Sequence, residues 1–514
     1  MKKDLSKVYA RLMDKFKEMI VLSSASSLLG WDMMTMMPPK GINLRSQQLA
    51  LLAALGHRMA TDPEVGKLLD TMMQHSNYEV LDAIQKRNVD LIRKSYLEQV
   101  ALPEELVTEM QRQHSIAHDV WRKAKTSNDW KTFMPELEKN VDLAKRAADI
   151  LMKVKKTDTS YDALIDIYEA KMTAKDIDQL FTELRSGLIW LMDKIKNSPY
   201  QPDTSLLHRR IPIDLQRKIS IALTQAVQYD VISKNAAGRI DETEHPFTTG
   251  YYDDVRITTH YYEDQFTHSL FSILHESGHA LYEQQINPEW IFQPVGTACS
   301  MGIHESQSRF VENIVGRSLD FWTYFLPKLK NIAGDVISDF DLERFVEAIN
   351  LVTPTKIRIE ADEVTYGLHV IIRFNIEKDL FAGNISVKDL PEIWNQSYKE
   401  YLGVKIENYT EGILQDMHWA SGDFGYFPCY ALGNLYDGQL LAKMNQDMPN
   451  WHQDLAKDGF TMVKDWLGQN VHSLGNLYDP PELIKKITTK ELTVEPYLKY
   501  LNDKYSRIYK MPNK

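Results

Sequence analysis

Two histidines and a glutamate in the pentapeptide His275-Glu276-Ser277-Gly278-His279 have the clearest chemical meaning in this chain of 514 residues. Residues four apart lie on one face of a helix, so His275 and His279 can hold one zinc ion between them. Glu276 can then take a proton from the water that the metal activates. The pattern therefore predicts a zinc hydrolase that cuts peptide bonds.

The context of the motif favours a helix. Apolar residues recur around it at helical spacing, and they are Leu270, Phe271, Ile273, Leu274 and Leu281. This periodicity predicts an amphipathic, buried helix. Gly278 costs about 1 kcal/mol relative to alanine inside a helix, so we interpret it as a place where something approaches the backbone. The alternative is a helix whose histidines are ordinary surface or core residues, because H-E-x-x-H also arises by chance.

A hydrolytic zinc site usually has three protein ligands, and the third candidate lies downstream. Glu305 begins a second predicted helix and completes a His/His/Glu set, which leaves a fourth position for water. His304 is the rival ligand. Neighbouring residues on a helix point about 100° apart, so we do not expect both to reach one metal. The alternative role for Glu305 is an acid that favours the helix dipole.

Five segments outside the zinc motif also form a pattern. They are His245-Pro246-Phe247, Asp254-Val255-Arg256-Ile257-Thr258, His304-Glu305-Ser306-Gln307, Ile357-Arg358-Ile359-Glu360-Ala361-Asp362 and Gly412-Ile413-Leu414-Gln415-Asp416-Met417-His418-Trp419. In type and order they match the HPF, DxRxT, HES/GQ, IRxxAD and GxxQDxHW motifs of the Taq-type metallocarboxypeptidases, also called thermostable carboxypeptidases. The chain resembles this family over nearly its whole length. The resemblance implies an elongated helical fold with a deep groove, one Zn²⁺ per chain with Co²⁺ as a possible substitute, and a homodimer.

A carboxypeptidase must recognise a free terminal carboxylate, and the fork of an arginine matches a carboxylate with two hydrogen bonds. Arg358 is the leading candidate because it lies in a family motif. Alternatively, Arg358 pairs with Asp362, four residues further along a predicted helix. Arg256 is the rival, although it too has acidic neighbours in Asp253 and Asp254.

Two further residues are candidates for substrate binding. His418 is able to donate a hydrogen bond to the reaction's oxyanion or to the substrate carboxylate. The alternative is a core histidine held by Asp416 or by a backbone carbonyl. Tyr430 lies in an aromatic segment and offers its hydroxyl for the same purpose, but an aromatic stripe is more often packing.

Bulk properties exclude several classes of function. The net charge is −11, and basic residues are dispersed among acidic ones, which argues against nucleic-acid binding. Cys299 and Cys429 are the only cysteines, too few for a disulfide framework. No apolar run is long enough to span a membrane, and the first residues are not followed by an apolar signal core. We therefore expect a cytoplasmic protein.

The predicted fold is mainly α, with one large helical body, a deep active-site groove and a small β-sheet beside the H-E-x-x-H helix. We expect a single domain over 1–514, with an N-terminal helical part over about 1–240, the metal and substrate site over about 241–434, and C-terminal helices over 435–514. Periodicity predicts helices near 5–30, 44–56, 78–99, 104–125, 134–155, 174–196, 214–228, 267–286, 304–318, 341–350, 356–377 and 388–402.

Other signals complete the predicted fold. Pro103 and Pro135 are expected in first turns of helices. Residues 247–262 are rich in β-branched and aromatic types and predict a short hairpin or small sheet, whose edge strand is suited to bind an extended peptide. Residues 420–434 are expected to form a loop.

The function that these features favour is a zinc-dependent metallocarboxypeptidase with broad specificity. It acts on peptides with a free C-terminus. A second hypothesis is an oligopeptidase that cuts inside short peptides with the same zinc triad. A third is a non-catalytic helical scaffold that binds peptides, against which Glu276 argues because a structural zinc needs no base.

Overall fold

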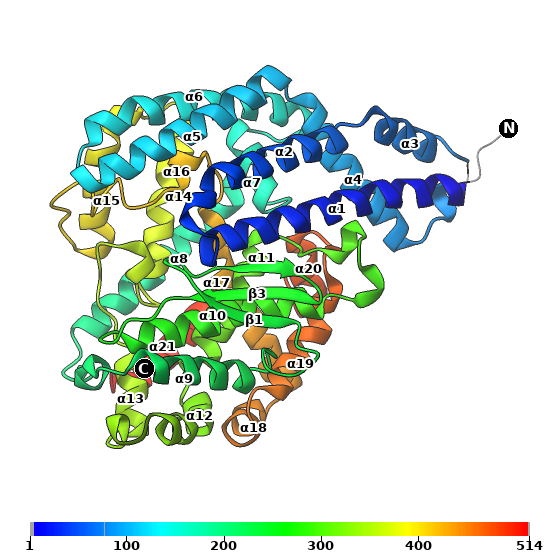
Figure 1. Cartoon of the computed structure of the whole chain (residues 1–514). Coiled ribbons are helices and arrows are strands. Elements are labelled where there is room, and N and C mark those ends of the chain that lie inside the picture. The colour runs from blue at the N-terminus through cyan, green and yellow to red at the C-terminus, as the bar shows by residue number, and fades with distance from the viewer. Residues whose placement is uncertain (1–4, 77, 512–514) are drawn as a thin grey trace.

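A computed structural model describes residues 5–76 and 78–511, and it is mainly helical with one small sheet (Figure 1). This confirms the predicted fold class. The helices of the N-terminal part are α1 (Leu5–Thr35), α2 (Ile42–Ala60), α3 (Pro63–Met73), α4 (Ala83–Ala101), α5 (Glu104–Ser127), α6 (Trp130–Lys155), α7 (Ser160–Tyr168), α8 (Ala174–Lys196) and α9 (Ile213–Ala226).

The helices of the remaining chain lie below or to the left of α1 and α2 in Figure 1. They are α10 (Phe266–Gln285), α11 (Met301–Arg309), α12 (Leu319–Ala333), α13 (Leu342–Ile349), α14 (Tyr366–Ala382), α15 (Leu390–Leu402), α16 (His418–Ser421), α17 (Pro428–Asp447), α18 (Trp451–Asp458), α19 (Thr461–Asn470), α20 (Pro480–Thr488) and α21 (Glu495–Ile508). A π-helical turn, Phe310–Val315, continues α11.

Side-chain caps explain several helix starts. The carboxylate of Asp82 accepts the backbone N–H of Gln85, whose side chain accepts from Asp82 in return, so α4 begins with a capping box. Asp129 caps α6 through the N–H of Thr132. Because α6 therefore begins at Trp130, Pro135 lies inside the helix, and the prediction of a first-turn proline was wrong there.

The predicted helix over 356–377 was wrong in its first half. Arg358–Glu360 forms a short 3₁₀ turn, and α14 begins only at Tyr366. The carboxylate of Asp362 accepts the backbone N–H groups of Val364 and Thr365 and so favours a turn over a continuous helix. Arg358 and Asp362 consequently do not lie on one helix face.

The predicted loop over 420–434 was also wrong in part. Pro428 occupies the first turn of α17, where its missing N–H costs nothing. Residues 428–434 are therefore helical, and Tyr430 projects from the first turn of α17 rather than from a loop.

The sheet has three strands, β1 (Gly238–Glu242), β2 (Thr248–Tyr251) and β3 (Asp254–Thr259), in the order β1-β3-β2. β2 and β3 form the predicted antiparallel hairpin, in which Thr248 is paired with Ile257. β1 pairs with β3 in parallel and was not predicted. Because β3 is central, β2 is an edge strand next to α10.

The buried apolar residues form one large cluster that runs from Ala117 to Tyr509. It crosses the expected boundaries near 240 and 434. A separate, smaller cluster between Leu5 and Ile92 joins α1, α3 and α4. No helix of the described residues is long and apolar enough to cross a membrane.

Candidate metal centre and active site

The two histidines of the H-E-x-x-H motif lie one turn apart on α10. α11 passes close to Gly278, which lies between them. A Cβ atom on Gly278 would lie 2.4 Å from the carbonyl oxygen of Gln307 and 2.7 Å from the Cα of Ser308. The glycine therefore permits the close contact between the two helices, as its cost inside a helix suggested.

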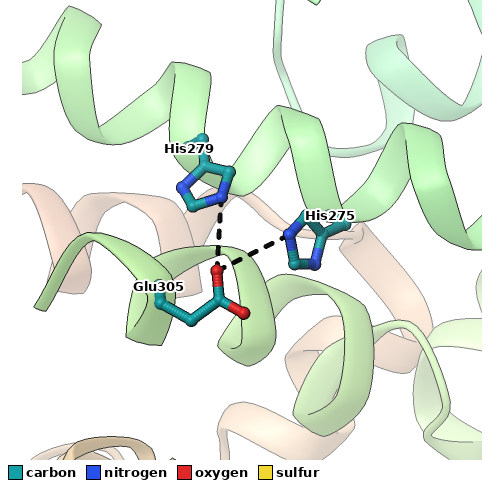
Figure 2. Close-up of side chains that lie close together, drawn as sticks. All are labelled: His275, His279 and Glu305. Atoms are coloured by element: carbon teal, nitrogen blue, oxygen red, sulfur yellow. Dashed lines mark ion pairs between the residues drawn. The ribbon is translucent and has the colours of Figure 1, made fainter. Parts of the chain in front are cut away.

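Glu305 projects from α11 toward both histidines (Figure 2). Its Oε2 lies 3.5 Å from Nε2 of His279 and 3.7 Å from Nε2 of His275. A tetrahedral zinc site with bonds of about 2.1 Å has ligand atoms about 3.4 Å apart. The three side chains are thus spaced as ligands of one ion, and no other group of His, Cys, Asp or Glu in the described residues is arranged in this way.

The outer nitrogen of each histidine also has a partner. Nδ1 of His275 lies 2.9 Å from Oε2 of Glu312, in the π-helical turn. Nδ1 of His279 lies 2.6 Å from Nδ1 of His304, whose Nε2 lies 2.9 Å from Glu283. Such partners orient metal-binding imidazoles and fix their tautomers. His304 therefore contacts a candidate ligand instead of competing with Glu305.

The charges of the site differ from residue to residue. Burial disfavours the imidazolium form of His275, but the carboxylates of Glu305 and Glu312 outweigh it and raise its pKa to about 9. Burial lowers the pKa of His279 to about 3. Burial also acts against the charge of Glu305, yet Arg309 and His275 hold the pKa of this carboxyl well below its usual range. An anionic ligand is therefore available at neutral pH.

Glu276 faces the same space from α10 and is 6 % exposed. Its Oε2 accepts a hydrogen bond of 2.6 Å from the hydroxyl of Thr248 on β2. Burial raises the pKa of the Glu276 carboxyl, and His275 and Thr248 act in the opposite direction. A buried carboxylate beside a metal site suits a proton acceptor.

These residues line a cavity of about 1290 Å³, and its wall also includes Arg358 and Tyr430. Arg358 is buried. The pair with Asp362, which the sequence offered as an alternative, is not formed. Nε and Nη2 of Arg358 donate instead to Oδ1 of Asp416, at 3.0 and 2.9 Å. The two residues are 58 apart in sequence, so helical spacing gave no sign of this pair.

Asp416 is shared between two arginines. Its Oδ2 accepts a hydrogen bond of 2.6 Å from Nε of Arg373, which is fully buried. Burial acts against the charge of Asp416, but Arg358 and Arg373 keep its pKa well below the usual range. One carboxylate thus faces two guanidinium groups, and the cluster carries a surplus positive charge at the cavity wall.

His418 and Tyr430 lie next to this cluster. Nε2 of His418 is 3.1 Å from the hydroxyl of Tyr430, and its Nδ1 is buried with no hydrogen-bond partner in the described structure. Burial, helped by Arg358, lowers the pKa of His418 to about 3, so the imidazole is neutral. The alternative role of His418, a core histidine that donates to Asp416 or to a backbone carbonyl, is not seen in the described residues.

Arg256 lies elsewhere. Its guanidinium stacks on the ring of Trp31, with 4.3 Å between its central carbon and the ring centroid. It also forms hydrogen bonds with Asp254. Arg256 is absent from the described lining of the cavity. Its contacts fasten α1 to the sheet.

The chain is similar to known proteins over nearly its whole length. Residues 11–505 match the family model of the carboxypeptidase Taq (M32) metallopeptidases. The chain belongs to the M32 family. It is 40 % identical over 510 residues to thermostable carboxypeptidase 1 of Thermus thermophilus, covering 98 % of this chain and 99 % of that protein. It is 39 % identical to carboxypeptidase 1 of Bacillus subtilis, over 96 % of this chain and 97 % of that one.

Solved structures of M32 enzymes have the same fold. The M32 carboxypeptidase of Deinococcus radiodurans superposes with a TM-score of 0.93 at 35 % identity, covering 98 % of this chain and all of that one. The chain is a metallocarboxypeptidase, which confirms the predicted enzyme class. The family implies a divalent metal, and two neutral or neutralisable imidazoles with one carboxylate are a chemically suitable set of donors for it.

The sequence analysis missed the partners behind this M32 site, namely Glu312, Glu283 and Thr248. Glu312 had a signal, because it lies seven residues after Glu305 and so on the same side of a continuing helix. Glu283 likewise lies four residues after His279. Thr248 had none, since its contact with Glu276 depends on how β2 meets α10.

Proposed function

We propose that this M32 carboxypeptidase is a zinc enzyme that removes C-terminal residues with broad preference. The observation that carries the proposal is that donor atoms of His275, His279 and Glu305 all lie within 4.8 Å of one another, beside Glu276. These three residues would hold one Zn²⁺ per chain, and Co²⁺ suits the same donors. When bound, the metal supplies a water of lowered pKa and polarises the scissile carbonyl.

Glu276 acts as the general base. Its carboxylate accepts the proton of the attacking water and later delivers it to the leaving amine. The hydrogen bond from Thr248 occupies Oε2. Among the described residues no hydrogen bond reaches Oε1, so this oxygen is free to receive the proton.

Arg358 receives the terminal carboxylate of the peptide. One N–H on each of Nη1 and Nη2 has no hydrogen-bond partner within the described residues, because Tyr366 and Asp416 occupy the other donors. The surplus charge of Arg358 and Arg373 over Asp416 also favours an anion, since a buried unpaired charge is costly. Substrate binding would balance this charge.

Tyr430 and His418 provide further hydrogen bonds. The Tyr430 hydroxyl lies at the cavity wall and has Nε2 of His418 behind it at 3.1 Å. If neutral His418 accepts on Nε2, the Tyr430 hydroxyl is oriented toward it, and the oxygen of Tyr430 accepts from the substrate. If His418 donates from Nε2, the hydroxyl is free to donate to the oxyanion or to the terminal carboxylate.

The edge strand β2 is suited to bind the peptide backbone. The backbone N–H of Thr258 donates to the carbonyl oxygen of Phe247, so the next pair, Thr248 and Ile257, is of the non-hydrogen-bonded type. The N–H and C=O of Thr248 therefore point away from β3. Since Phe247 and Thr248 line the cavity, an extended peptide can add to this edge.

Two measurements test the proposal. Glu276→Gln should lower kcat at least about 100-fold, as expected for loss of a general base, with metal content still near one per chain. Full activity in this variant would contradict the mechanism. Hydrolysis of one peptide as free acid and as C-terminal amide tests carboxylate recognition. Equal rates would contradict carboxylate recognition and favour the oligopeptidase.

We also propose that the enzyme is a cytoplasmic homodimer that pairs through α1 and α2. Residues 19–56 carry only three charged side chains, Asp32, Lys40 and Arg45, and the first and last of these pair with each other. None of the 19 residues of α2 is buried. Exposed apolar side chains gather here, and they are Val21, Leu28, Met34, Met36, Ile42, Leu44 and Leu51.

A nearly uncharged, apolar face can meet its own copy without repulsion, and interface centres are depleted in charge. Sedimentation of the wild type should show a dimer, and a variant with both Leu44→Glu and Leu51→Glu should be a monomer. Val80→Glu is the control, because Val80 is 82 % exposed outside this face. A dimer that survives the double substitution would place the interface elsewhere.

A further inference from the structure

We propose that Thr248 is a positioning residue that holds the carboxylate of Glu276 in its reactive orientation. This inference rests on the role of Glu276 as general base in the proposed function. The Thr248 hydroxyl lies 2.6 Å from Oε2 of Glu276 and 3.1 Å from the backbone carbonyl oxygen of the same residue. A hydroxyl has one proton to donate, and the shorter distance assigns it to the carboxylate.

The position of Thr248 is itself fixed from the central strand. The N–H of Phe247 donates to Oγ1 of Thr258 at 2.8 Å, and the N–H of Thr258 donates to the carbonyl oxygen of Phe247 at 2.9 Å. Thr258 is fully buried. The residue just before Thr248 is therefore held at both of its backbone polar groups.

The sheet is also fastened to the helix that carries Glu276. Oγ1 of Thr259 lies 2.5 Å from Oγ of Ser272, one turn before Glu276 on α10. A glutamate has three side-chain torsions, and each is free unless a contact restrains it. The strand and the helix are tied together on one side of the base, and the Thr248 hydroxyl then restrains its carboxylate.

These contacts explain the structural role of two sequence motifs. The threonine of Asp254-Val255-Arg256-Ile257-Thr258 holds the phenylalanine of His245-Pro246-Phe247, and the residue after that phenylalanine contacts the base. Both segments thus support Glu276, although neither contains a residue that we assign to the metal or to the chemistry.

The test compares three variants by kcat, KM, metal content and thermal stability. Thr248→Val keeps the shape of the side chain and removes the hydroxyl, whereas Thr248→Ser retains it. Thr249→Val is the matched control, because Thr249 is the next residue of the same strand and its side chain lies on the opposite face of the sheet.

Outer partners of metal ligands contribute about 10- to 100-fold. We expect a similar factor for the partner of the general base, so Thr248→Val should lower kcat by about that factor with KM nearly unchanged. Thr248→Ser should keep most of the activity, and Thr249→Val should resemble the wild type. Metal content should remain near one per chain in all three.

Two results would overturn the inference. They are wild-type kcat in Thr248→Val, or an equal loss of kcat in Thr248→Ser and Thr248→Val. Either result leaves the proposed function intact as long as Glu276→Gln is inactive. Full activity of Glu276→Gln would instead refute the proposed function itself, so the two failures are distinguishable.

Discussion

Nδ1 of His279 lies 2.6 Å from Nδ1 of His304, and this contact determines how both rings carry their protons. Glu283 is an acceptor, so Nε2 of His304 carries a proton, and Nδ1 of His304 accepts the proton on Nδ1 of His279. Glu283 contacts His304 and not the candidate metal ligands, yet it thus fixes the tautomers of both imidazoles.

Removal of this support should weaken metal binding. We expect His304→Ala to raise the dissociation constant for Zn²⁺ by about 10- to 100-fold, the usual effect of losing an outer partner. Chelator competition measures it without depending on activity. His452→Ala is the control, because that histidine is half exposed and contacts Asp320 on the surface. An unchanged dissociation constant in His304→Ala would show that the contact with His279 does not support metal binding.

Gly278 and Gly30 allow a matched test of helix packing. Gly278→Ala places a Cβ atom against the backbone of α11 at Gln307, so α10 and α11 must separate. We expect a lower melting temperature and weaker metal binding. Gly30→Ala in α1 meets no atom within 4 Å and should stabilise the protein by up to about 1 kcal/mol through helix propensity. Similar effects of the two substitutions would contradict the role of Gly278 in the close packing of α10 and α11.

The sequence predicted the long, strongly periodic helices well, because each needs only its own apolar face. α8 was placed at 174–196, as the structure has it. The three candidate metal ligands were also identifiable, since two share a helix and the third lies near the start of another predicted helix. The structure brings their side chains together as expected, and their binding of a metal remains a proposal.

Long-range pairing explains what the sequence did not reveal. Arg358 was assigned a helical partner four residues away, but no helix forms there and Asp416 takes that place from another segment. β1 was missed because a parallel strand has no hairpin signal. The contact between Thr248 and Glu276 was also missed, because it depends on how a strand packs against a helix that is distant in sequence.

Substitutions of Arg358 and Arg256 should show which of the two arginines recognises the terminal carboxylate. Hydrogen bonds to charged groups contribute about 1.5–3 kcal/mol, so Arg358→Met should lower kcat/KM for a free-acid peptide about 10- to 150-fold. The slow hydrolysis of the corresponding amide should change little. Arg256→Met should leave the preference for the free acid unchanged, because Arg256 stacks on Trp31 outside the cavity. The reverse pattern in these two variants would assign carboxylate recognition to Arg256.

Glu377 should make stability depend on pH near neutrality. Its carboxyl is fully buried and accepts hydrogen bonds from Tyr161, Trp419 and Gly425. Burial outweighs these donors and raises its pKa to about 7. A carboxyl whose pKa is higher in the folded state stabilises the fold at low pH, and this contribution is lost as the pH rises through about 7.

Glu377→Gln cannot titrate and resembles the protonated wild type. The free energy of unfolding of the wild type, relative to this variant, should therefore decrease between pH 5 and pH 8. One unit of pKa shift corresponds to about 1.4 kcal/mol. The difference in the free energy of unfolding should therefore decrease by at most a few kcal/mol. Urea unfolding of both proteins at pH 5, 6.5 and 8 measures the difference, and other titrating groups cancel in it. A difference that stays constant over this range would show that Glu377 is ionised throughout, with its three donors outweighing burial.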